Sequence, residues 1–209
     1  MAKHEKDSPA TRAVRTWRLE GAASAPAGPV DDAVAAEAAL TLEVEGAGSF
    51  TLMCTPADVE ALAAGFLLAE GLIDDADDIE AMAVRAGEAP AVAVRIAEPQ
   101  RLAEGRNMIV SSSCGFCGSR TIDKALASAR PAGDTLKVTP AELAQAMEQL
   151  SVAQEVFRAT GGTHAAGIFA PGVGLLSAAE DIGRHNALDK AVGKCLLACR
   201  PTQGCAAVL

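Results

Sequence analysis

The stretch LTLEVEGAGSFTLMC, residues 40–54, decides the fold of the first part of the chain. Apolar side chains occupy every second position on both sides of a glycine-containing turn. Alternation with a period of two around such a turn predicts a β-hairpin with one buried face. The last apolar position is Cys54, which we therefore interpret as a small buried hydrophobic residue. The alternating residues before it are Leu40, Leu42, Val44, Phe50 and Leu52.

A helix is predicted directly after this hairpin. Thr55 suits the N-cap, Pro56 suits the first helical position, and Asp58 places an acid in the first turn. Gly71 is expected to end the helix. Its predicted apolar face consists of Val59, Leu62, Ala63, Phe66 and Leu67.

The first part of the chain is therefore expected to form a small α+β domain over residues 37–105, in which a sheet carries one helix. The alternation AVAVRIA predicts a further strand at residues 91–97. Residues 1–36 mix charges with Ala, Pro and Gly, and we interpret them as a mobile leader.

The second part, residues 106–209, interleaves predicted strands with predicted helices, which favours an α/β domain. The expected strands are 108–110, a hairpin formed by 166–170 and 174–179, and a strand beginning at 206. The expected helices cover 122–129, the stretch from a Thr139 N-cap to about Ala159, and the residues from the segment EDIGRHN to Leu196.

Composition and charge exclude several classes of protein. Half of the 209 residues are hydrophobic, which is typical of a globular chain. Aromatic residues make up 3% and the net charge is −9, so nucleic acid is not an expected partner. No membrane span and no secretory signal are apparent, so we expect a cytoplasmic protein without membrane association. Residues 1–84 hold 16 acidic and 5 basic side chains, and the remainder hold 11 and 13, so a site for an anion is expected in the second part.

The six cysteines are too few and too irregularly spaced for a secreted disulfide framework. The sharpest motif is Cys114-Gly-Phe-Cys117-Gly, between a predicted strand and a predicted helix. A sulfur near a helix N-terminus is stabilised as thiolate. The motif alone leaves open a reactive sulfur, a pair of inert cysteines, or a structural zinc site. The further zinc ligands would come from Cys195, Cys199 and Cys205, or from His164 and His185.

Two polar segments carry groups that suit an anionic ligand. Gly161 and Gly162 permit positive φ and close approach of a ligand to the backbone, and His164 follows them. The segment EDIGRHNALDK begins at residue 180, where a predicted hairpin enters a helix and presents Arg184 and His185. A carboxylate four residues after His185, on the same helix face, could orient the imidazole.

Both segments also have a purely structural interpretation. The Gly-Gly loop could be a surface turn with a structural histidine. The charged segment could be an ordinary helix start with Asp181 as a capping acid, which accounts less well for the run Arg184-His185-Asn186. The zinc-deaminase signature does not fit, because no H-x-E sequence begins at His185 and the CxxC motif comes before it.

In this order and spacing, CGFCG, TGGTHAAGIF and EDIGRHNALDKAVG closely resemble the FdhD family of formate dehydrogenase accessory sulfurtransferases. The earlier segment TLMCTPADVEALAAGFLLAEGLI is also similar to the first domain of that family, so the resemblance covers about residues 37–209. It implies a small N-terminal domain joined to an α/β domain of cytidine-deaminase-like architecture, usually as a homodimer.

The resemblance implies that the chain is a sulfur carrier. A cysteine desulfurase would load sulfane sulfur onto Cys114 or Cys117. The sulfur would pass to a molybdenum or tungsten bis(molybdopterin guanine dinucleotide) cofactor, which is then inserted into formate dehydrogenase. No permanent metal is implied, and the chemistry requires an accessible cysteine of low pKa. The residues expected to bind the cofactor are Gly161, Gly162, His164, Asp181, Arg184, His185 and Asn186.

Members of the family continue for some tens of residues beyond the position at which this chain stops, Leu209. We therefore expect the second domain to be incomplete at its C-terminus. The family pattern assigns no role to Cys195, Cys199 or Cys205. The competing hypothesis is a zinc-stabilised binding module that chaperones the molybdenum cofactor without carrying sulfur.

Overall fold

The predicted hairpin of residues 40–54 is confirmed and lies at the centre of the larger sheet. The structure is a computed structural model that describes residues 8–17, 28–85, 87, 89–99, 108–110 and 136–209. Strands β3 (Ala38–Val44) and β4 (Gly48–Cys54) are antiparallel, with Leu40 opposite Leu52. The alternating apolar side chains are buried, as the period of two requires.

The hairpin belongs to a five-stranded sheet with the order β5-β6-β3-β4-β7. The predicted strand of residues 91–97 is confirmed as β6 (Ala91–Ile96), which runs parallel to β3, whereas β5 (Ile79–Arg85) was not predicted. Strand β7 (Met108–Val110) pairs in parallel with β4. We expected it to open the second domain, but it joins the first sheet.

Helix α1 (Val59–Ala69) covers one face of this sheet and begins later than the sequence indicates. Its N-cap is Asp58, at φ 53°, so the prediction of Thr55 as N-cap is wrong. Thr55 instead makes long-range hydrogen bonds, described below. The predicted end is confirmed, because Gly71 has φ 69° and its N–H donates to the carbonyl of Leu68.

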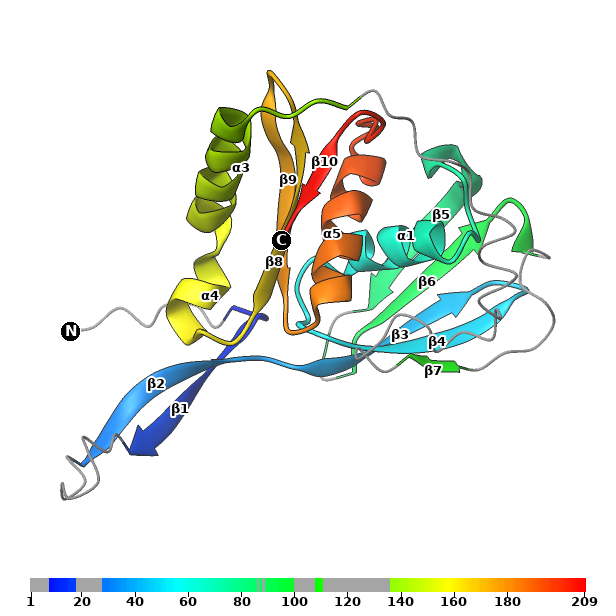
Figure 1. Cartoon of the computed structure of the whole chain (residues 1–209). Coiled ribbons are helices and arrows are strands. Elements are labelled where there is room, and N and C mark those ends of the chain that lie inside the picture. The colour runs from blue at the N-terminus through cyan, green and yellow to red at the C-terminus, as the bar shows by residue number, and fades with distance from the viewer. Residues whose placement is uncertain (1–7, 18–27, 86, 88, 100–107, 111–135) are drawn as a thin grey trace.

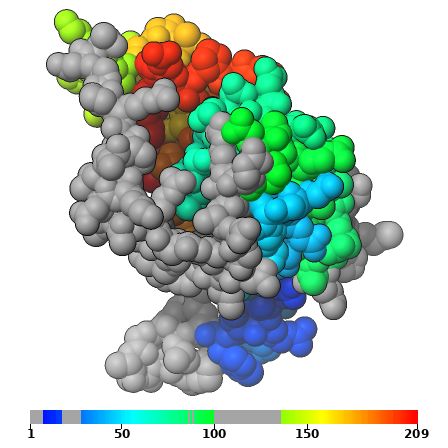
Figure 2. All heavy atoms as spheres, turned by 90° about the vertical axis from the view of Figure 1, so that its right-hand side faces the viewer, coloured from blue at the N-terminus to red at the C-terminus, as the bar shows by residue number. Residues whose placement is uncertain are grey.

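The segment predicted to be a mobile leader contains a hairpin, so that prediction is wrong for these residues. Strands β1 (Thr11–Trp17) and β2 (Pro29–Ala35) are antiparallel, with Arg15 opposite Asp31. The hairpin stands out from the body of the molecule (Figures 1 and 2), and Trp17 is 62% exposed. Because neither face of the hairpin is buried, its sequence lacks the clear alternation that marks β3 and β4.

The second sheet has three strands in the order β10-β8-β9 within the described residues. The predicted hairpin is confirmed as β8 (His164–Ala170) and β9 (Gly174–Asp181), and the predicted final strand as β10 (Ala206–Val208). The helix predicted after the segment EDIGRHN is confirmed as α5 (Arg184–Leu197), which packs on one face of this sheet.

Helix α3 (Pro140–Ala153) packs on the opposite face of the second sheet. Its predicted Thr139 N-cap is confirmed as part of a capping box. We expected one helix to about Ala159, but it breaks at Gln154, where ψ is 70°, and α4 (Glu155–Thr160) follows. The helix expected over 122–129 lies outside the described residues.

Helices α1 and α5 lie between the two sheets and join them (Figure 1). Their backbones touch at two glycines: a Cβ atom on Gly65 would collide with the carbonyl of Asp189, and one on Gly193 with that of Ala61. The mixed α/β fold class is confirmed, while the cytidine-deaminase-like architecture stays a prediction. None of the helices within the described ranges is both long and apolar enough to cross a membrane.

Candidate functional site

The seven residues predicted to bind a cofactor come together where β8 begins and β9 ends. His164, the first residue of β8, pairs with Asp181, the last residue of β9. The Gly161-Gly162 loop leads directly into β8, and the chain turns after Asp181 into α5. The antiparallel register therefore brings the two segments, which are separate in the sequence, to one edge of the second sheet.

Asp181 is fully buried and organises the turn into α5. Its Oδ1 accepts hydrogen bonds from the N–H of Gly183 at 2.8 Å and from the side-chain amide of Asn186 at 3.1 Å. Its Oδ2 accepts the N–H of Thr55 at 3.0 Å. The Asn186 amide also donates to the carbonyl of Met53 at 2.8 Å. Asp181 and Asn186 thus use their polar atoms inside the protein and fix the start of α5.

Lys190 completes this cluster and was missed by the sequence analysis. It is fully buried, and its Nζ lies 2.6 Å from Oδ2 of Asp181. The same ammonium donates to the carbonyls of Thr55 at 2.8 Å and Glu180 at 3.3 Å. The available signal was its place in the charged segment EDIGRHNALDK, within a predicted helix. We call Thr55, Asp181, Asn186 and Lys190 the buried polar cluster.

The groups that remain exposed at this edge are cationic or able to become cationic. Arg184 and His164 are exposed, and within the described part of the chain Arg184 has no ion-pair partner. Arg184 is the first residue of α5, whose N-cap Gly183 supplies no side-chain cap. The exposed Arg184 guanidinium therefore lies at a first helical turn that has no side-chain cap, an arrangement that favours an anion.

The expected pairing of His185 with the carboxylate one turn further on, Asp189, is not formed. The Nδ1 atom of His185 is buried without a hydrogen-bond partner among the described residues. Burial raises the pKa of Asp189 to about 7, and the nearby carboxylates of Glu70 and Asp181 add to the shift. Asp189 is therefore half protonated near neutral pH instead of serving as a fixed anion beside the imidazole.

The two cysteines predicted to be catalytic, Cys114 and Cys117, lie outside the described residues. The described chain leads toward them along β7, which ends at Val110, four residues before Cys114 in the sequence. Val110 is paired with Leu52, close to the end of β4. The chain thus enters the CxxC segment from the strand next to β4, and β4 leads directly into the buried polar cluster at Thr55.

The other cysteines differ in how accessible they are. Cys54 is fully buried, as predicted, and burial followed by the negative charge of Asp181 raises its pKa to about 12. Cys195 is also buried, and its Sγ donates to the hydroxyl of Ser177 at 3.2 Å. Cys199 is exposed and Cys205 is half-buried. Across the described ranges, no three His, Cys, Asp or Glu side chains are grouped so that they could hold a metal ion.

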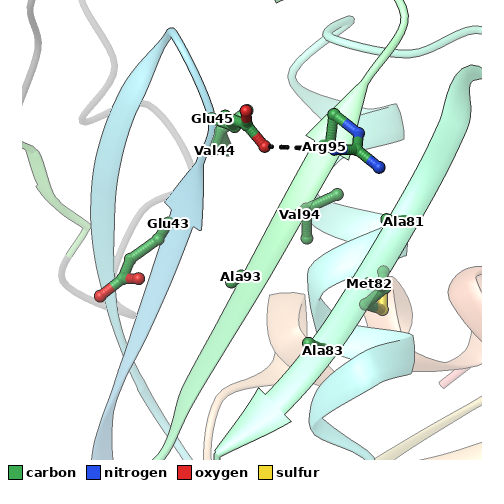
Figure 3. A pocket seen from close by; sticks show the side chains of 9 residues that line it. All are labelled: Glu43, Val44, Glu45, Ala81, Met82, Ala83, Ala93, Val94 and Arg95. Atoms are coloured by element: carbon green, nitrogen blue, oxygen red, sulfur yellow. Dashed lines mark ion pairs between the residues drawn. The ribbon is translucent and has the colours of Figure 1, made fainter.

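A separate hollow of about 420 Å³ lies on the five-stranded sheet, across β3, β6 and β5 (Figure 3). Its charged lining includes Arg95 and Glu45, whose side chains are paired at 3.9 Å. None of the predicted site residues lines it, so we do not assign it to the site.

The fold is similar to that of a crystal structure from Desulfotalea psychrophila, provisionally named a formate dehydrogenase accessory protein. The TM-score is 0.68 at 21% sequence identity, and the match covers 95% of this chain and 72% of that one. The chain therefore has the two-sheet α/β fold of that accessory protein.

The family follows from the sequence comparison. The model of the FdhD/NarQ family matches residues 35–209, and the chain belongs to this family. "Sulfur carrier protein FdhD" of Anaeromyxobacter sp. (strain K) is 42% identical over 187 residues, which are 83% of this chain and 64% of that protein. The protein of the same name from Streptomyces coelicolor is 38% identical over 178 residues, 79% of this chain and 63% of that protein. The chain thus spans less than two thirds of the length of these relatives.

Proposed function

We propose that this chain is a sulfur carrier, a sulfurtransferase that accepts sulfane sulfur from a cysteine desulfurase on Cys114 or Cys117. It delivers the sulfur to a molybdenum or tungsten bis(molybdopterin guanine dinucleotide) substrate, and formate dehydrogenase requires the product. The observation that carries the proposal is membership of a family whose matched relatives are named sulfur carriers. The Cys-Gly-Phe-Cys sequence supplies the thiols that such a carrier needs.

The loading step needs no external oxidant. The carrier thiolate attacks the outer sulfur of the persulfide on the desulfurase, and a new S–S bond forms on the carrier. The S–S bond of the donor breaks, and the donor cysteine leaves as a thiolate. Cys54 does not suit this step, because it is buried and its pKa of about 12 keeps it protonated at neutral pH.

The edge at the start of α5 supports an anionic substrate. Arg184 and His164 are exposed there beside the uncapped N-terminus of α5. Guanidinium and backbone N–H groups are typical ligands of a pyrophosphate. We assign the guanine dinucleotide part of the substrate to this edge, with the Gly161-Gly162 loop giving it close access to the backbone. That the carrier acts in the cytoplasm as a homodimer is also part of the proposal and rests on the family resemblance.

The sulfur carrier proposal is tested by intact-mass spectrometry. The purified chain is incubated with a cysteine desulfurase and cysteine. We expect a gain of about 32 Da, the mass of one sulfur atom, which dithiothreitol removes because sulfane sulfur is reducible. Replacing Cys114 and Cys117 together by Ser should abolish the gain, because a hydroxyl is too weakly acidic to replace the thiolate.

Matched variants on the same chain control for the other thiols. Cys199→Ser removes an exposed cysteine outside the motif and should leave the full mass gain. Undiminished uptake by the Cys114→Ser, Cys117→Ser protein, with the label on residues 195–205, would show that the proposal is wrong.

A further inference from the structure

The buried polar cluster contains an ion pair that the stability of the fold does not by itself explain. Asp181 and Lys190 are both 0% exposed, and their charged atoms are 2.6 Å apart. Removing two charges from water costs about as much free energy as their attraction returns, so an apolar pair of similar size is often equally stable.

The hydrogen bonds of this pair are complete. The Lys190 ammonium has three hydrogens, and three acceptors surround it: Oδ2 of Asp181 and the carbonyls of Thr55 and Glu180. The Asp181 carboxylate receives Lys190, two backbone N–H groups and the Asn186 amide. A buried network in which each member is satisfied fixes a single geometry, because any displacement leaves a buried polar group unpaired.

The pair connects three places in the fold. Through Thr55 it holds the end of β4, beside the strand that leads toward the CxxC segment. Through Glu180 and Asp181 it holds the end of β9, and through the N–H of Gly183 it holds the start of α5. Arg184 and His185 follow Gly183 directly.

We propose that Asp181 and Lys190 act as a positioning pair, which fixes Arg184 and His185 at the start of α5 relative to the end of β4. The pair touches no substrate and acts through the residues that it places. The identity of the ligand at Arg184 rests on the proposed function, whereas the placement of His185 does not.

A second lysine on the same helix provides a matched comparison. Lys194, one turn after Lys190, pairs with Asp58 at 2.7 Å, but the two side chains are 35% and 42% exposed. Its Nζ also donates to the carbonyl of Ala178 at 2.9 Å. Lys194 therefore links the same helix to the residues before α1 without contacting the turn at Gly183.

The test replaces the pair by neutral residues of similar size, Asp181→Asn with Lys190→Met. The side-chain carbonyl oxygen that Asp181→Asn introduces can still accept from Gly183 and Asn186. No unpaired charge is buried, but the backbone groups of Thr55 and Glu180 that contact the charged pair lose those partners. Three quantities are measured: the melting temperature, the imidazole NMR signals, and the affinity for GDP as a guanine nucleotide probe. The chain has three histidines, so the signal of His185 can be assigned by one His185→Gln spectrum.

We expect the paired variant to fold but to melt below the wild type, because the backbone groups of Thr55 and Glu180 lose hydrogen-bond partners. Its His185 signal should shift or broaden, and its affinity for GDP should fall about tenfold or more. Lys194→Met should leave the His185 signal in place and the affinity within twofold. Should the paired variant fail to fold, Asn186→Ala removes one link of the cluster and is expected to move the same signal.

An unchanged His185 signal in the folded variant would overturn the positioning pair, whatever the melting temperature. If the wild type does not bind GDP, the proposed substrate class is wrong, but the His185 signal still decides between a positioning and a merely structural pair. A weaker affinity together with an unchanged signal would also contradict the proposal, because the effect would not pass through the start of α5.

Discussion

Helix α5 is held in two different ways at two places along its length. In its middle it meets α1 backbone to backbone, through Gly65 and Gly193, and the contact is close and free of side chains. At its start it meets the ends of β4 and β9 through the buried polar cluster. Both contacts join the same two halves of the molecule, yet one is made of packing and the other of directional hydrogen bonds.

The difference shows how stability and placement are divided along one helix. The hydrophobic effect, which favours close packing, is not directional. Hydrogen bonds to buried charges tolerate little displacement. The contact with α1 therefore sets how strongly α5 is held, and the buried polar cluster sets where the first turn of α5 points.

The largest expected effect comes from breaking the packed contact. Gly193→Ala or Gly65→Ala would place a Cβ atom against a backbone carbonyl of the facing helix, so α1 and α5 must move apart. We expect a loss of about 3 kcal/mol or more of unfolding free energy, the upper range for overpacking, measured by urea denaturation. Gly172→Ala is the control, since nothing lies within 4 Å and only its φ of 73° is strained, which costs about 1 kcal/mol. Equal losses in the three variants would contradict the close contact.

A smaller effect is expected at Asp189, whose backbone carbonyl faces Gly65 in the packed contact. Its pKa is about 7 in the folded protein, mainly because of burial, and about 4 when unfolded, so the folded state holds the proton more tightly. This group therefore lowers the stability as the pH rises from about 4 through 7. Asp189→Asn removes that loss. We expect the difference in unfolding free energy between the variant and the wild type to grow by roughly 2 kcal/mol from pH 5 to pH 8. A difference in unfolding free energy that is the same at both pH values would show that Asp189 does not titrate in this way.

The smallest effect is expected far from both contacts, at the start of α3. Thr139→Ala removes the hydroxyl that accepts the N–H of Glu142 at 3.2 Å and half of the capping box. The expected cost is about 1 kcal/mol of unfolding free energy in urea. Because α3 packs on the far face of the second sheet, the imidazole signal of His185 should not change. A shifted signal would mean that the start of α5 is sensitive to any loss of stability.

Local signals in the sequence were enough for much of the fold. Alternation located β3, β4 and β6, the Thr-Pro pair located α3, and Gly71 located the end of α1. These features depend on residues that are close in the sequence. The hairpin β1–β2 buries neither face, so it lacks the pattern by which strands are recognised.

The candidate site was predicted in part. The exposed groups Arg184 and His164 were found because their residue types and loop positions are unusual. Thr55 and Lys190 were missed as site residues mainly because the contacts that Thr55 makes with Asp181 and with Lys190 span 126 and 135 residues. Thr55 even has the residue type of a helix N-cap, and only the tertiary structure shows that it bonds to Asp181 instead.

The central claim is that the buried residues place Arg184, and that Arg184 itself serves an anionic substrate instead of the fold. Isothermal titration of GDP into wild type and Arg184→Ala, with melting curves of both, tests it most directly. We expect the variant to melt as the wild type does and to bind GDP about 10- to 100-fold more weakly, which corresponds to about 1.5–3 kcal/mol for a hydrogen bond to a charged group. A variant that melts much earlier yet binds GDP like the wild type when folded would contradict the account.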